Sequence, residues 1–221
     1  PRISALSLAI RLGVAGLVMG LASPDVFAAC SPASPTAGAT VTCTGVPTLL
    51  LIPNTFNSAV NTLTVNVTAG TKLNTLVGGV ALSLTGNNTT LNNAGTIDPA
   101  VLGLVSALSG GVVIGNSTAN ALNITNAATG VINGTGALLG LNLASLGGMA
   151  LNATNGVGGT TTIVNDGTIG SSFLLGLSLL SSDTPVVAVQ GPAQVNMTNN
   201  CTLTGRVSLE SSTTGTTFRD T

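Results

Sequence analysis

Along most of the chain, apolar side chains alternate with Thr, Asn or Ser, which is the two-residue period of a β-strand. Leu63, Val65 and Val67 alternate with Thr64 and Asn66. The same alternation recurs in segments 80–84, 122–124 and 195–197. Each predicted strand therefore has one aliphatic face and one polar face, and Thr favours strand conformation on an exposed face.

The strands belong to a sequence repeat. The triplet Leu-Gly-Leu begins at positions 102, 139 and 175, so the period is 37 and then 36 residues, and segment 78–97 is an earlier partial copy. In the second and third copies the segment around the triplet alternates as a strand does, whereas the first copy also fits a short helix. We expect strands there.

Similar turns follow the strands in each copy. The sequences are Asn93-Ala-Gly95, Asn126-Ala-Ala128, Asn165-Asp-Gly167 and Asn199-Asn200, each before a pair that resembles Thr-Ile. Asn and Gly tolerate the left-handed backbone that a sharp corner needs. We expect these corners to stack, with the Asn side chains bonded to one another along the stack.

These patterns predict an all-β fold, a parallel β-solenoid over residues 47–221. One coil cannot bury its apolar face alone, so several coils must stack. The period exceeds that of a minimal coil, which predicts a protruding loop or an extra strand. The chain begins without Met and stops at Thr221 within a strand-like pattern, so we expect a piece of a longer protein, truncated at its C-terminus.

Residues 1–28 have the parts of a secretory signal peptide, which we expect to be helical. Arg2 and Arg11 precede the small and apolar run 12–22, and cleavage after Ala28 would make Ala29 the first residue. A buried N-terminal helix is the alternative. A lipoprotein signal at Cys30 is disfavoured, because Phe27 stands where such signals carry a Leu-like residue.

Export to an oxidising compartment permits a disulfide in the lead-in segment, residues 29–46. We predict that Cys30 pairs with Cys43, which would contribute about 3 kcal/mol by closing a short loop. Cys201 is then unpaired, and we expect it to be a small buried hydrophobic residue.

The composition excludes several classes of function. Charged residues make up 5% of the chain, the net charge is -1, and the only cation between Arg11 and Arg206 is Lys72. Nucleic-acid binding needs clustered Lys and Arg, so we expect none. Past residue 30 no apolar run reaches the roughly 20 residues of a membrane helix.

We expect no catalytic site, cofactor or metal. The chain has no His to activate a nucleophile. The acids beyond the signal are spread along the chain, which favours turn positions over a catalytic pair or a metal site: Asp98, Asp166, Asp183, Glu210 and Asp220. Triplets such as Asn66-Val-Thr68 and Asn123-Ile-Thr125 are either glycosylation sites or strand alternation, and we favour alternation.

The lead-in Ala29-Cys30-Ser-Pro-Ala-Ser-Pro-Thr-Ala-Gly-Ala-Thr-Val-Thr-Cys43, together with Leu-Asn-Asn-Ala-Gly-Thr-Ile (91–97) and Ile-Val-Asn-Asp-Gly-Thr-Ile (163–169), resembles bacterial autotransporter passengers. The resemblance implies a right-handed β-helix, exported through the periplasm to the cell surface by a C-terminal β-barrel translocator. It implies an adhesive, non-enzymatic protein that binds a ligand on a host or neighbouring cell. The alternatives are the N-terminal part of a secreted β-helix enzyme and a two-partner-secretion exoprotein.

Overall fold

The computed structural model describes residues 29–46, 53–75, 79–99, 109–118, 120–135, 149–172, 185–209 and 215–221. Every regular element in these residues is a β-strand, and all strand pairs between named strands are parallel except β1–β2. The all-β, parallel-sheet character predicted from the alternation is therefore confirmed. The expected signal-peptide helix in residues 1–28 and the Leu-Gly-Leu segments lie outside the described residues.

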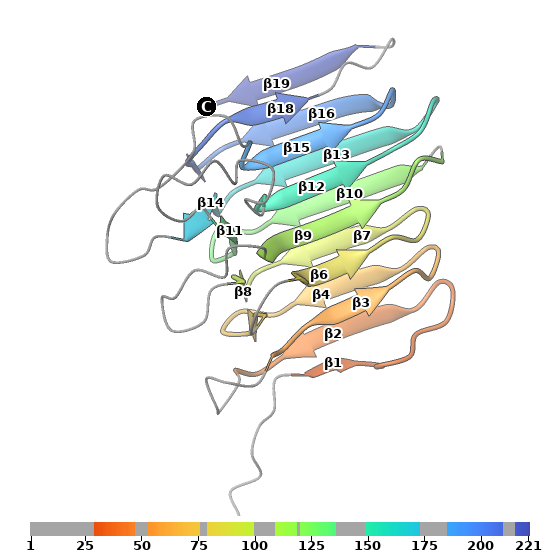
Figure 1. Ribbon diagram of the computed structural model, residues 1–221, viewed down its shortest axis with the longest axis vertical. Coiled ribbons are helices and arrows are strands. Elements are labelled where there is room, and N and C mark those ends of the chain that lie inside the picture. The colour runs from red at the N-terminus through yellow and green to blue at the C-terminus, as the bar shows by residue number, and fades with distance from the viewer. Residues whose placement is uncertain are drawn as a thin grey trace, which may run out of the picture.

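The strands form three sheets (Figure 1). Sheet 1 contains β1 (Ala29–Ser31), β2 (Thr40–Thr44), β4 (Thr64–Val67), β7 (Thr90–Asn93), β10 (Ala121–Asn126), β13 (Thr160–Asn165), β16 (Gln194–Asn199) and β19 (Thr216–Asp220). Sheet 2 contains β5 (Lys72–Leu73), β8 (Thr96–Ile97), β11 (Val131–Thr135), β14 (Thr168–Ser172) and β17 (Thr202–Leu203). Sheet 3 contains β3 (Phe56–Ser58), β6 (Gly79–Leu84), β9 (Ser109–Gly115), β12 (Leu151–Thr154), β15 (Val187–Gln190) and β18 (Val207–Leu209).

From β4 onward the chain visits sheets 1, 2 and 3 in turn and then returns to sheet 1. Each return places a strand directly beside its predecessor in the same sheet. The strands therefore lie in layers that follow the order of the chain, from β1 at one end to β19 at the other (Figure 1).

The core consists of apolar columns that run across the layers, because residues in register place like side chains above one another. In sheet 1 one column is Val41, Val65, Leu91, Ile124, Ile163, Met197 and Phe218. In sheet 2 it is Leu73, Ile97, Ile132, Ile169 and Leu203. In sheet 3 it is Leu82, Val112, Leu151, Val187 and Val207.

The predicted alternation is confirmed in sheet 1. Leu63, Val65 and Val67 are buried, whereas Thr64 and Asn66 are only half-buried on the opposite face. In β6 the pattern is less simple: Leu82 and Leu84 are buried as predicted, but Ala81 is buried as well. Both faces of sheet 3 are therefore covered in part, and the alternation of burial is weaker there than in sheet 1.

Candidate functional site

A column of buried asparagines marks the corner between sheet 1 and sheet 2. Asn93, Asn126, Asn165 and Asn199 end β7, β10, β13 and β16, lie in register, and are at most 2% exposed. Each Nδ2 donates to Oδ1 of the next residue, at 2.8, 2.7 and 2.6 Å in chain order. Asn199 then donates to Oδ1 of Asp220 at 2.7 Å. We call this column the asparagine ladder.

The backbone fixes the orientation of each amide in the ladder. Oδ1 of Asn165 accepts from the N–H of Gly167 at 3.3 Å, and its Nδ2 donates to the carbonyl of Thr202 at 3.1 Å. Nδ2 of Asn126 likewise donates to the carbonyl of Gly130 at 3.2 Å. Because the oxygen meets a donor and the nitrogen meets acceptors, the ladder has one direction, with every amide donating toward the C-terminal end.

The predicted stacking of the asparagine corners is confirmed, but the expected role of glycine there is wrong. Gly95 is not among the residues with positive φ. A Cβ added to it would lie 2.6 Å from the carbonyl oxygen of Thr68 in the layer beneath. Glycine is required at this corner because two backbones approach closely, and not because the corner needs a left-handed conformation.

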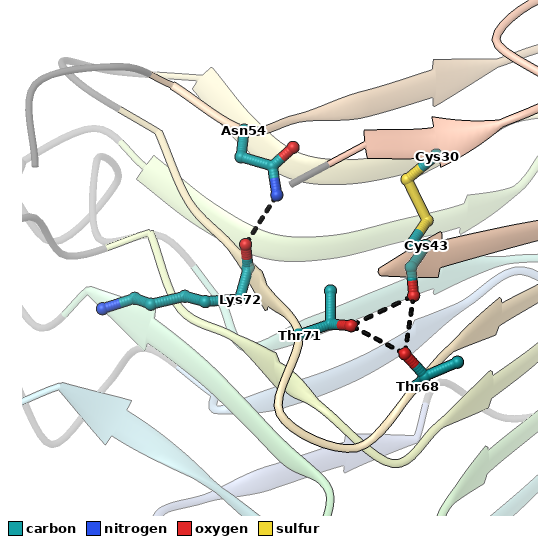
Figure 2. The surroundings of a disulfide bond; sticks show 6 residues. All are labelled: Cys30, Cys43, Asn54, Thr68, Thr71 and Lys72. Atoms are coloured by element: carbon teal, nitrogen blue, oxygen red, sulfur yellow. Dashed lines mark hydrogen bonds between the residues drawn. A yellow bond between two sulfur atoms is a disulfide. The ribbon is translucent and has the colours of Figure 1, made fainter. Parts of the chain in front are cut away.

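The N-terminal end of the stack is closed by a disulfide. Cys30 and Cys43, which we predicted to pair, lie opposite each other in the antiparallel pair β1–β2 and are joined by an S–S bond of 2.01 Å (Figure 2). Cys43 is fully buried. The predicted cleavage residue Ala28 lies outside the described residues, and Ala29 is the first residue of β1.

Beneath Asn93 the ladder position is apolar, because Val67 and then Cys43 occupy it in register. Threonine hydroxyls bond to the corner carbonyl there instead. Oγ1 of Thr68 and Oγ1 of Thr71 donate to the carbonyl of Cys43 at 3.0 and 3.1 Å, and the two hydroxyl oxygens lie 2.9 Å apart (Figure 2). The disulfide is thus tied into the corner above it.

The outward side chains of sheet 1 form a polar surface, which we call the Thr/Asn face. One outward column is Thr40, Thr64, Thr90, Asn123, Thr162, Asn196 and Thr217, and the next is Thr42, Asn66, Asn92, Thr125, Val164, Thr198 and Arg219. Neighbouring strands in a sheet lie about 4.8 Å apart, so hydroxyl and amide groups repeat at that spacing. Arg219 is the only charged residue in these two columns.

Part of the Thr/Asn face is bonded internally. Nδ2 of Asn92 donates to Oδ1 of Asn66 at 2.9 Å, and Oγ1 of Thr217 donates to Oδ1 of Asn196 at 2.8 Å. The face therefore presents both donors and acceptors in fixed rows. Such a surface suits an extended polar ligand that lies across several strands, whereas small molecules are usually bound in concave pockets.

A second group of asparagines, at the turns that lead into sheet 1, was not predicted. Asn155 is fully buried, and its Oδ1 accepts from the N–H of Asn120 at 2.9 Å. Oδ1 of Asn120 accepts in turn from the N–H of Asn88 at 3.1 Å. The available signal was the recurrence of Asn a few residues before the strands that begin at Thr90, Ala121 and Thr160.

The acidic residues do not come together in the described part of the chain, and no group of three or more metal-ligating side chains occurs there. Asp166 precedes β14 at the corner and accepts from Nδ2 of Asn200 at 2.7 Å. Asp98 follows β8 and accepts from Nδ2 of Asn133 at 3.3 Å. Asp183 and Glu210 lie outside the described residues.

The expectation that Cys201 is buried is wrong, since this free cysteine is exposed. It precedes Thr202 as Gly167 precedes Thr168, and these two threonines lie in register, so Cys201 occupies the corner-glycine position. The strand that follows it, β17, ends sheet 2 among the described strands. With no described layer beyond β17, the cysteine side chain remains open to solvent.

Among the described residues there is no helix with the length and apolarity needed to cross a membrane. No family model, curated protein or solved structure matches the chain.

Proposed function

We propose that this chain is an exported autotransporter passenger, a right-handed parallel β-helix that acts as an adhesive stalk at the bacterial surface. The observation that carries the proposal is the cycle of strands through sheets 1, 2 and 3 with in-register columns across the layers. A chain that winds in this way forms an elongated body, and an elongated body suits display at a distance from the membrane.

The proposed handedness rests on a general rule for parallel strands. A connection between two parallel strands of one sheet is right-handed in about 98% of cases. Here each return to sheet 1, from β4 to β7 and from β10 to β13, is such a connection through the other two sheets. A right-handed coil is therefore the expected arrangement.

Export is supported by the leader-like residues 1–28 and by the disulfide that follows directly. A disulfide between Cys30 and Cys43 persists in an oxidising compartment such as the periplasm or the cell surface. The Thr/Asn face supports adhesion, because it offers rows of hydroxyl and amide groups along sheet 1, with Arg219 as the only charged residue in its two columns. The ligand that matches it is polar and extended.

Export is tested by producing the chain with its own leader in a Gram-negative bacterium and sequencing its N-terminus by mass spectrometry. We expect the exported form to begin at Ala29. The matched variant Ala28→Asp replaces the small residue before the cleaved bond and should retain the leader. A chain that stays in the cytoplasm with its leader uncut contradicts the proposal.

Adhesion is tested separately, by fusing the chain to a surface-displayed β-barrel and counting the displaying cells that attach to host-cell monolayers. We expect attachment above that of cells displaying the barrel alone, and loss of the excess when Thr64, Asn92 and Thr162 are changed to Lys. The control variants are Asn57→Lys and Val157→Lys, which add lysine at exposed residues away from these columns. Equal attachment by all displayed forms would refute adhesion through this face.

A further inference from the structure

The Thr/Asn face keeps one composition from layer to layer. From β2 to β16 its two outward columns hold Thr or Asn at every position except Val164, and they contain no charged or aromatic side chain. Thr40, Asn92 and Asn123 are exposed, and the others are half-buried. The strands that carry them follow one another along the length of the molecule (Figure 1). The surface is therefore a neutral array that repeats once per strand.

Thr and Asn alternate irregularly within these columns. The first column changes from Thr90 to Asn123, then to Thr162 and to Asn196. Both side chains donate and accept hydrogen bonds, so one can replace the other without changing what the column can bind. A face of this kind selects its partner by spacing, because the order of its side chains has no regularity for a partner to match.

The spacing along the stack is about 4.8 Å, and it limits the class of partner. An α-helix has a pitch of about 5.4 Å, so a helix lying along the columns would be half a period out of step after about four strands. A single extended chain presents the side chains of one face about 6.7 Å apart, which is a poorer match. The strands of a cross-β fibril lie about 4.8 Å apart, so its side-chain columns stay in step with sheet 1 over many strands.

The neutrality of the face limits the kind of fibril. A column of one charged side chain repels itself in an in-register fibril, since like charges then lie on neighbouring strands. Columns of Asn, Gln, Ser or Thr have no such repulsion, and amide columns bond along their own length. The Thr/Asn face does the same where Nδ2 of Asn92 donates to Oδ1 of Asn66 at 2.9 Å. That bond uses one of the two amide N–H groups, which leaves the other for a facing column.

We propose that the Thr/Asn face binds the side of a cross-β fibril whose outward columns are Asn, Gln, Ser or Thr, with the stack of this chain lying along the fibril axis. Each strand of sheet 1 then faces one strand of the fibril, and side chains pair column against column, as they do between the sheets of a fibril. The inference rests on the proposed use of this face for adhesion and names its class of ligand. It uses only the strands from β2 to β16.

Co-sedimentation of the purified full chain with fibrils of a synthetic polyglutamine peptide tests the proposal. We expect saturable binding to the fibrils and none to the soluble peptide, because only the fibril has the repeat. Binding should change by less than about twofold between about 0.05 M and about 0.5 M salt, because neither surface is charged. Equal binding to microcrystalline cellulose, a neutral hydroxylated surface that is not built of strands, would overturn the proposal.

Paired substitutions identify the face. Thr64→Lys with Thr162→Lys places two cations between the columns, and we expect the dissociation constant for fibrils to rise at least about tenfold. Asn57→Lys with Val157→Lys adds the same charge at exposed positions elsewhere and should leave binding unchanged. Thr64→Ser with Thr162→Ser keeps both hydroxyls and should also bind normally, and circular dichroism checks that every variant is folded. Equal binding by the two lysine pairs overturns the proposal.

The outcome is separable from that of the adhesion experiment. Attachment of displaying cells to host monolayers without fibril binding would overturn this inference alone, whereas fibril binding without attachment would support it and count against adhesion to host cells. A second copy of the chain has the same spacing and is the competing partner. Self-association that the Thr64 and Thr162 lysine pair abolishes, at concentrations below those needed for fibril binding, would assign the face to that partner instead.

Discussion

The two ends of sheet 1 differ although the same corner is built at both. At the N-terminal end the ladder position holds Cys43 and Val67, the short antiparallel strand β1 covers the edge, and a disulfide holds β1 in place. At the C-terminal end the same position holds Asn199 and then Asp220, and β19 is exposed along its whole length.

The difference shows that one backbone corner can be stabilised in two ways. Asparagine bonds to its own corner and to the layers on either side, so it suits the middle of a stack. The side chains of Cys43 and Val67 donate no hydrogen bonds to the corner above them, and the hydroxyls of Thr68 and Thr71 satisfy the carbonyl of Cys43 instead. An apolar position closed by a covalent bond suits an end.

The largest effect is expected from a carboxylate in the middle of the ladder, at Asn165→Asp. One carboxyl oxygen would face Oδ1 of Asn199 and the carbonyl of Thr202, which are both acceptors. An unpaired buried charge should lower the free energy of unfolding by about 4 kcal/mol at pH 7. Urea unfolding measures the loss.

This variant should also depend on pH. Burial and the facing acceptors raise the folded-state pKa of the new carboxyl above its unfolded value of about 4. Stability should therefore be retained at pH values below about 4 and lost as the pH rises through the folded pKa. Asp220→Asn, at the end of the ladder, should change stability by less than about 0.5 kcal/mol. Equal losses in the two variants would refute the distinction between middle and end.

Removal of the disulfide should have the next largest effect. Replacing both Cys30 and Cys43 by Ala frees β1 and is expected to lower the free energy of unfolding by about 3 kcal/mol. Hydrogen exchange should rise first in β1 and β2. The control Cys201→Ser removes the exposed free cysteine and should leave the unfolding curve unchanged. An unchanged curve in the double variant would mean that β1 does not need the bond.

The smallest effect is expected when the ladder is extended toward the disulfide. Val67→Asn places an amide beneath Asn93, whose Oδ1 accepts one bond from Gly95 and has a second lone pair free. We expect a loss of about 1 kcal/mol, since the new hydrogen bond offsets part of the lost apolar burial. Val65→Asn, which faces Leu91 and has no ladder partner, should cost at least about 2 kcal/mol more. Similar losses in the two variants would show that ladder geometry does not extend below Asn93.

Much of the fold could be predicted because its signals are local. The period of two around Leu63–Val67 identifies strands from adjacent residues, and the corners at Asn93, Asn126, Asn165 and Asn199 repeat in recognisable sequence. The asparagines around Asn155 were missed because their partners lie in turns of variable length, where no fixed spacing marks them. The burial of Cys201 was wrongly predicted because burial depends on whether a further layer lies above the residue.

The sequence by itself determined the strands, their inward faces, the corner asparagines and the candidate pair Cys30–Cys43, since each follows from spacing within a few neighbouring residues or from residue type. Only the tertiary structure decided which strands share a sheet, that the ladder donates in one direction, and that Asn199 donates to Asp220 in the next layer. These properties arise between segments that lie about 20 to 40 residues apart in the chain. Their relative register is set by the stacking of whole layers, which no local pattern specifies.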